Sequence, residues 1–218
     1  MSYSIAIFDL DGTLLDTLED LHLSVNAALT QHGLPSRSRE EIRAFVGDGV
    51  EMLIRRAVPN GTKEASIASI LSDFKAIYAR DCMEHTAPYP AISALLASLR
   101  ERGVRVAVVS NKFDAAVKSL CSHYFGAPVE VAIGERADVR KKPAPDTVFE
   151  TLRALDATAK DAVYIGDSDT DILTARNAGM DCISVTWGFR DEDFLRDHGA
   201  VVIAHTPDEL LRLILTEK

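Results

Sequence analysis

Short apolar runs alternate with segments of helical periodicity from Pro88 to the end of the chain, and this alternation limits the fold more than any other feature. With one more run near the start, they predict strands at residues 4–8, 104–109, 129–133, 162–165, 182–185 and 201–203. The segments between them predict helices at residues 91–102, 114–124, 145–155 and 169–178. Strands that alternate with helices form a mainly parallel sheet covered on both faces. The sequence therefore predicts an α/β fold with a Rossmann-like sheet.

The region between the first two strands has a different pattern. Asp16 or Thr17 caps an expected helix, and Gly33 ends it. Residues 38–85 show only helical periodicity, with breaks at 47–49 and 59–61. We therefore predict an inserted, all-helical domain. The predicted boundaries are residues 1–15 and 89–218 for the α/β core, and residues 16–88 for the helical insertion.

Charge and cysteine content limit the partners and the compartment. The 218 residues include 33 acidic and 24 basic side chains, a formal net charge of −9, which argues against nucleic acid or an anionic membrane as a partner. The three cysteines are widely spaced, so we expect neither a disulfide framework nor a zinc site. No apolar run approaches the roughly 20 residues that span a bilayer, and the first residues lack a basic leader. We expect a cytoplasmic protein.

Two carboxylates follow the first expected strand directly. Asp9 and Asp11 are two residues apart, so they share a face if the extended backbone continues past Phe8. Close carboxylates repel unless a cation or proton lies between them, and Mg²⁺ favours one or two carboxylates with phosphate oxygens. Gly12 would let the backbone approach an anion. The alternative is a polar turn after a strand.

Three later segments carry further candidate residues. Ser110 and Asn111 end the second expected strand, where they form either a phosphate cradle or a helix cap. Arg140-Lys141-Lys142 is either a solvated loop or a local attraction for an anion. The cluster at residues 167–171 follows another buried strand, and it lacks the spacing of an EF-hand calcium loop. Trp187-Gly188-Phe189 packs either near the site or in a loop, and we expect the six histidines to be structural.

These segments resemble the four motifs of the haloacid dehalogenase superfamily, in its phosphatase form. Asp9-Leu10-Asp11-Gly12-Thr13 looks like the first motif and Ser110 like the second. Lys142-Pro143-Ala144-Pro145-Asp146 is similar to the third, with Lys141 the less favoured lysine. Gly166-Asp167 with Asp171 is similar to the fourth, and Asp169 has no counterpart role.

The resemblance implies an aspartyl-phosphate mechanism with Mg²⁺. Asp9 would be the nucleophile and Asp11 the general acid and base. Asp171 would bind metal-bound water or orient Lys142. The implied catalytic residues are Asp9, Asp11, Ser110 and Lys142; the implied phosphate and substrate residues are Gly12, Ser110, Asn111, Lys142 and Arg43; and the implied metal ligands are Asp9, Asp11 (through its backbone carbonyl), Asp167 and Asp171.

The position of the helical insertion matches the C1 cap of the family. Arg43 to Val50 resembles the specificity region of phosphoglycolate phosphatases, and Arg43, Arg55 or Arg56 would meet a substrate carboxylate. Asp48 departs from that pattern, since many of those proteins have Asn there. We expect a small phosphorylated metabolite as the substrate, with 2-phosphoglycolate first. The alternatives are a sugar phosphomutase, a pyrophosphatase or nucleotidase, and a non-catalytic binding module. Monomer and homodimer both remain open.

Overall fold

The computed structural model describes residues 3–216, so the ends of the expected core, residues 1–2 and 217–218, lie outside the described residues. The chain divides into two compact units. The core unit is Met1–Leu15 with Pro88–Lys218, and the helical unit is Asp16–Ala87. The chain passes between them in the short strands β2 (Leu15–Asp16) and β3 (Ala87–Pro88), which pair with each other.

The core unit is built on a six-stranded sheet in which every pairing is parallel. Its strand order is β5-β4-β1-β6-β7-β8, so β1 lies in the middle and the order reverses beside it. A ligand site in such a sheet lies beyond the carboxyl ends of the strands at this reversal. The predicted α/β class is confirmed. The strands are β1 (Ile5–Phe8), β4 (Arg105–Phe113), β5 (Val129–Glu135), β6 (Ala162–Gly166), β7 (Asp181–Val185) and β8 (Val202–Ala204).

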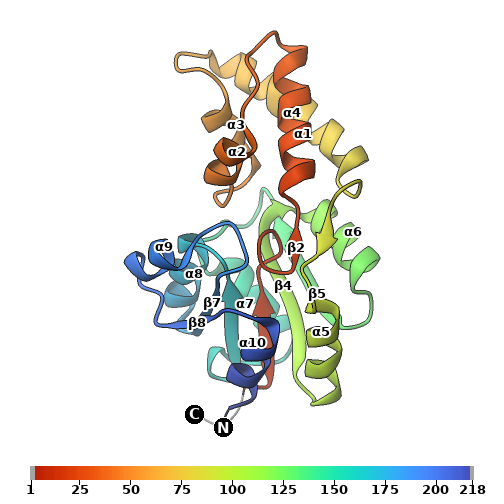
Figure 1. Cartoon of the computed structure of the whole chain (residues 1–218). Coiled ribbons are helices and arrows are strands. Elements are labelled where there is room, and N and C mark those ends of the chain that lie inside the picture. Colours follow the sequence, from red (N-terminus) through yellow and green to blue (C-terminus); the bar gives the residue numbers. More distant parts are fainter. Residues whose placement is uncertain (1–2, 217–218) are drawn as a thin grey trace. The chain divides into compact units, whose positions relative to one another are not determined.

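Helices cover both faces of this sheet (Figure 1). On one face, alternate residues of β1, β4 and β6, such as Ile7 and Val109, pack against Val148 and Leu152 of α7 and Ala175 of α8. Alternate strand residues point to opposite faces, and α5 and α10, which pack on each other, lie on the other face. The helices of the core unit are α5 (Ile92–Glu101), α6 (Asp114–Tyr124), α7 (Asp146–Ala154), α8 (Asp169–Ala178), α9 (Glu192–Asp197) and α10 (Pro207–Leu215).

The helical unit contains α1 (Leu18–Gln31), α2 (Arg39–Phe45), α3 (Val50–Ala57) and α4 (Glu64–Asp81). Apolar residues of α1, among them Leu21, Val25 and Leu29, are buried. Phe74 and Tyr78 of α4 are fully buried, and their rings stack 5.6 Å apart. Asp20 of α1 accepts hydrogen bonds from the backbone N–H groups of His85 and Thr86, which ties the start of α1 to the segment after α4.

The structure differs from the sequence-based assignment in the length of β4 and in two helices, α9 and α10. β4 continues to Phe113, four residues past the expected end, because Phe113 pairs with Glu135 of β5. The helices α9 and α10 were not predicted. α10 has the cap signals for a helix start, since Thr206 accepts a hydrogen bond from Glu209 N–H and Pro207 follows it.

Within residues 3–216, no helix is both long enough and apolar enough to cross a bilayer.

Candidate active site

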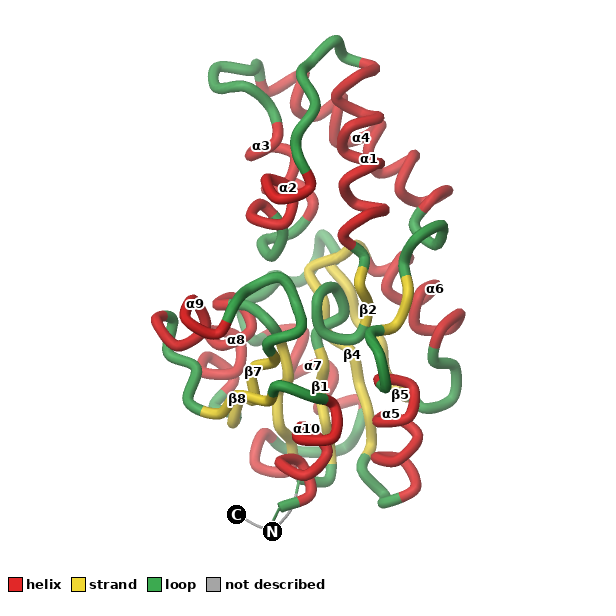
Figure 2. Tube along the Cα trace, in the orientation of Figure 1, coloured by secondary structure: helices red, strands yellow, loops and turns green. Residues whose placement is uncertain are grey.

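The site lies at the carboxyl ends of the two central strands. Asp9 follows β1, and Asp167 follows β6, its neighbour in the sheet. The backbone N–H of Asp9 donates to the carbonyl of Ile165 at 2.8 Å, which continues the pairing of β1 with β6 by one residue. The chain then bends at Leu10, so the extended backbone does not continue to Asp11. Figure 2 shows the loops that follow β1 and β7 at this same end of the sheet. The topology therefore brings together carboxylates that are far apart in the sequence.

Asp9, Asp167 and Asp171 form a buried acidic cluster. One carboxylate oxygen from each lies within 4.8 Å of the other two. Burial raises the pKa of Asp9 to about 7 against the opposing effect of Lys142, and the charge of Asp171 adds to the rise. Burial, with the charges of Asp171 and Asp9, raises the pKa of Asp167 to about 8. A cluster with these pKa values would be stabilised by a bound cation.

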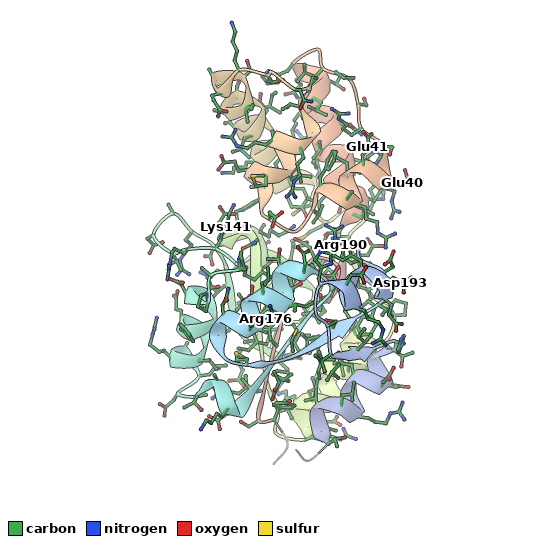
Figure 3. All side chains as sticks on the ribbon, turned by 90° about the vertical axis from the view of Figure 1, so that its left-hand side faces the viewer. Glu40, Glu41, Lys141, Arg176, Arg190 and Asp193 are labelled. Carbon is green, nitrogen blue, oxygen red and sulfur yellow. The ribbon has the colours of Figure 1, made fainter. Side chains whose placement is uncertain are left out.

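Lys142 supplies a positive charge to this cluster. Its Nζ lies 2.9 Å from Asp9 Oδ1 and 2.7 Å from Asp171 Oδ1, and it donates to the Tyr164 hydroxyl at 3.1 Å. Burial disfavours the ammonium, but the carboxylates of Asp171 and Asp9 raise the pKa of Lys142 well above its ordinary value. Lys141 is only half-buried in the loop before α7, at the edge of the core unit (Figure 3).

Asp171 is held by the helix start on which it lies. Ser168 caps α8, and its hydroxyl and backbone N–H donate to Asp171 Oδ2 at 2.6 and 3.1 Å. The other oxygen of Asp171 accepts from Lys142. Asp171 therefore contacts Lys142 and also belongs to the acidic cluster, and its two expected roles, the orientation of Lys142 and the binding of metal-bound water, stay predictions.

The residues expected to bind phosphate surround the same strand ends. Ser110 and Asn111 are buried in the extension of β4, and the Asn111 side-chain amide donates to the backbone carbonyl of Lys142 at 3.0 Å. Gly12 has a φ of 84°, and a Cβ there would overlap the carboxylate of Asp167. Gly12 is therefore required both by its left-handed backbone and by the space that Asp167 fills.

The segment after β7 belongs to this site. The indole N–H of Trp187 donates to the carbonyl of Thr13 at 3.0 Å, and the backbone N–H of Phe189 donates to Asp167 Oδ2 at 2.7 Å. A Cβ on Gly188 would lie 2.5 Å from Asp167 Cβ and would overlap the carbonyl oxygen of Gly12. Of the two alternatives left by the sequence for this segment, packing near the site is the one observed.

Asp11 lies apart from the acidic cluster. Its carboxylate is not among the three that converge, and both of its oxygens lie 2.9 Å from Nζ of Lys112. Its expected metal ligand, the backbone carbonyl, stays a prediction. Sequence reasoning missed Lys112 and Tyr164. A lysine directly after a buried strand that ends in Ser110-Asn111 was the available signal for Lys112, whereas Tyr164 looks like any apolar strand residue.

The donor set suits a hard divalent cation. Within the described chain, Asp9 Oδ1 is buried beside Lys142 yet makes no hydrogen bond of good geometry. The carboxylates of Asp9, Asp11, Asp167 and Asp171 carry two more charges, when all are ionised, than the buried ammonium groups of Lys112 and Lys142 that pair with them. Carboxylate oxygens are the ligands that Mg²⁺ and similar cations prefer.

In the helical unit, the arginines expected near a substrate differ in their partners. Arg55 pairs with Glu51 and Glu64 at 3.0 and 2.8 Å. Arg56 pairs with Asp48, so the carboxylate that departs from the family pattern is compensated by a cation of the same unit. Arg43 lies exposed on α2.

Comparison with known proteins agrees with the motifs. The sequence model of the haloacid dehalogenase-like hydrolases matches residues 6–185. The chain belongs to this family. A family member named phosphoglycolate phosphatase, from Pseudomonas syringae pv. tomato, is 31% identical over 218 residues, which are 95% of this chain and 77% of that protein.

Solved structures of the same family share the fold. A crystal structure from Lactobacillus delbrueckii subsp. bulgaricus is 39% identical, with a TM-score of 0.93 and full coverage of both chains. CbbY from Rhodobacter sphaeroides, crystallised with phosphate, is 28% identical, with a TM-score of 0.78 and coverage of 95% of this chain and 96% of its own. The chain is therefore an enzyme of this hydrolase family, with phosphatases among its relatives.

Proposed function

We propose that the protein is a Mg²⁺-dependent phosphatase that hydrolyses a small phosphate monoester through a phosphorylated Asp9. The observation that carries this proposal is the convergence of the buried carboxylates of Asp9, Asp167 and Asp171, of which Asp9 and Asp171 contact the buried ammonium of Lys142. A carboxylate beside a fixed cation, at the open end of a parallel sheet, suits attack on a phosphorus atom whose oxygens need positive charge.

In the first half-reaction, an Asp9 oxygen attacks phosphorus and the bond to the ester oxygen breaks. The electron pair of that bond stays on the leaving oxygen, and Asp11 gives it a proton. Asp9 must be ionised to attack, and Lys142 lowers its pKa against the effect of burial. The product of this step is an alcohol and an aspartyl phosphate.

In the second half-reaction, Asp11 takes a proton from water, and the water oxygen attacks the phosphorus of the intermediate. The bond between phosphorus and the Asp9 oxygen breaks, which releases phosphate and restores the Asp9 carboxylate, while the proton taken from water restores the protonated form of Asp11. Lys142, the Ser110 hydroxyl and backbone N–H groups stabilise charge on the phosphoryl oxygens in both steps. Asn111 supports Lys142 through its hydrogen bond to the backbone of that lysine.

Asp9, Asp167 and the backbone carbonyl of Asp11 would hold the magnesium ion. When bound, the ion supplies positive charge that offsets the carboxylates and the phosphoryl oxygens. The Thr13 hydroxyl and the Phe189 N–H donate to the two oxygens of Asp167 and orient this carboxylate.

We propose 2-phosphoglycolate as the first substrate to test, because relatives at about 31% identity carry that name. In this proposal the helical unit acts as the cap that selects the leaving group, and exposed Arg43 receives the substrate carboxylate. The Arg56 pair removes the objection that Asp48 would repel an anionic leaving group.

The test is phosphate release from a panel of esters with Mg²⁺, for the wild type and for Asp9→Asn. The panel holds 2-phosphoglycolate, sugar phosphates, a sugar bisphosphate, nucleotides and pyrophosphate. We expect turnover that vanishes with chelator and falls at least about 10⁴-fold in Asp9→Asn. If the wild type releases phosphate from none of these compounds, the phosphatase proposal is refuted. A preference for another ester would change only the proposed substrate.

A further inference from the structure

Lys112 is a buried lysine for which the chemistry proposed above has no role. Its side chain is 1% exposed, and its Nζ lies 2.9 Å from both carboxylate oxygens of Asp11, whose side chain is 13% exposed. An ammonium group loses several kcal/mol of hydration when it is buried, so it persists only with a well-placed partner. The symmetric two-oxygen contact gives Lys112 that partner and fixes the plane of the Asp11 carboxylate.

The two buried lysines of the site divide the carboxylates between them. Lys142 contacts Asp9 and Asp171, which belong to the converging acidic cluster. Lys112 contacts Asp11, which lies outside it. Asp9 and Asp11 are only two residues apart in the chain, yet each is held by a different ammonium. The arrangement keeps the attacking carboxylate and the proton-carrying carboxylate in separate orientations.

The backbone of Lys112 is clamped by its neighbours. β4 continues through Lys112 and pairs with β5 at Phe113. Gly134 of β5 packs so closely that a Cβ there would lie 2.6 Å from the Lys112 carbonyl oxygen. The Lys112 N–H donates to the Ser110 hydroxyl at 3.3 Å. The Lys112 side chain therefore projects from a fixed backbone, directly after the site residues Ser110 and Asn111.

We infer that Lys112 is a positioning residue that aims the Asp11 carboxylate at the oxygen atoms between which it moves protons. The inference rests on the proposed function, in which Asp11 protonates the leaving oxygen and later deprotonates water. Proton transfer requires heavy atoms within about 3 Å, and a misplacement of about 1 Å costs roughly 100-fold in rate. Lys112 acts through Asp11 and forms no bond with the phosphoryl group.

The first experiment compares Lys112→Met with the wild type on three esters. 2-Phosphoglycolate and 2-hydroxyethyl phosphate release alkoxides that need a proton, whereas p-nitrophenyl phosphate releases a stable phenolate that does not. We expect kcat for the two alkyl esters to fall roughly 100-fold with KM nearly unchanged. The p-nitrophenolate burst of the first turnover should slow by less than about threefold, because that step needs no acid.

Two outcomes of this experiment would overturn the inference. An equal loss on all three esters, burst included, would mean that Lys112 only supports the fold or stabilises the phosphoryl group. A rise in KM for 2-phosphoglycolate alone would mean that Lys112 binds the substrate carboxylate. A wild type that hydrolyses none of the esters would instead refute the proposed function, so the two failures are distinguishable.

The second experiment is a double-mutant cycle with Asp11→Asn. The double variant replaces the whole ion pair by uncharged groups, so it avoids the buried, uncompensated carboxylate that can unfold Lys112→Met. If Lys112 acts only through Asp11, adding Lys112→Met to Asp11→Asn changes kcat by less than about threefold. A further loss of roughly 100-fold in the double variant, with its circular dichroism spectrum intact, would overturn the inference.

Discussion

The charged residues at the strand ends of the core unit and those on the helices of the helical unit differ in burial. Lys142 and Asp171 are almost completely buried, and each contacts more than one charged or polar partner. In the helical unit, Arg55 and Glu64 pair with 34% and 76% of their side chains exposed. Exposed pairs contribute little because water solvates and screens them, whereas buried charges must be compensated by the fold.

This difference indicates where chemistry and where specificity are encoded. The core unit gives up stability to keep four carboxylates and two lysines in fixed geometry, which is typical of a catalytic site. The helical unit carries its charges on solvated surfaces, where a substitution changes the surface without disturbing the packing. We therefore expect variants in the core unit to affect turnover and variants in the helical unit to affect substrate affinity.

After Asp9→Asn, the largest effect should come from Lys142. We expect Lys142→Met to lower kcat/KM by about 1,000-fold, because two carboxylates and the phosphoryl group lose their buried cation. Its neighbour offers a matched control, since Lys141→Met removes the same charge from a half-buried loop position and should stay within about threefold of the wild type. Equal losses of kcat/KM in the two variants would show that the deeper burial of Lys142 gives it no larger role in catalysis than Lys141.

A smaller loss should follow from filling the space beside Asp167. A Cβ on Gly188 would press on Asp167 Cβ and on the Gly12 carbonyl, so Gly188→Ala should lower kcat/KM by about 30-fold and weaken Mg²⁺ binding. Gly103 has open space around it, and Gly103→Ala should cost about 1 kcal/mol of folding free energy through its positive φ, with activity unchanged. Steady-state kinetics, Mg²⁺ titration and thermal melts measure these outcomes.

Stability without metal should fall as the pH rises. The pKa of Asp9, raised to about 7, and that of Asp167, raised to about 8, lie above the ordinary 3.8. Between about pH 4 and pH 8 the folded protein binds more protons than the unfolded chain, so its free energy of unfolding decreases with pH.

We therefore expect the melting temperature in chelator to drop between about pH 5 and pH 8, and Mg²⁺ to raise it by several degrees at the upper pH. Asp167→Asn should show a smaller drop and a smaller response to Mg²⁺. A melting temperature that rises with pH in chelator would contradict the arrangement of carboxylates described here.

The smallest effect should come from the helical unit. Arg43→Met should raise KM for 2-phosphoglycolate by about threefold with kcat unchanged, since an exposed contact with a carboxylate is weak. Arg55→Met is the control, because Arg55 is already paired with Glu51 and Glu64, and we expect its KM to match the wild type. A loss of kcat in either variant would contradict the expectation that variants in the helical unit change substrate affinity and leave turnover unchanged.

Sequence periodicity predicted most of the fold. The strands at the sheet centre and the helices α6 and α8 lie where the apolar patterns put them, because buried elements repeat their apolar residues regularly. Beyond residue 185 the assignment found the strand β8 within one residue but missed the helices α9 and α10, which span only six and nine residues. It also ended β4 too early, because Ser110-Asn111-Lys112 reads as a polar loop although all three side chains are buried.

The sequence by itself determined which residue types stand at the strand ends, since Asp9, Ser110 and Asp167 each follow a recognisable apolar run. Tertiary structure decided which of them touch. The pairs Lys112 with Asp11 and Phe189 with Asp167 join residues 101 and 22 positions apart. Such contacts depend on strand order and on close approach at Gly12, Gly134 and Gly188, and no local pattern encodes a distance across a sheet.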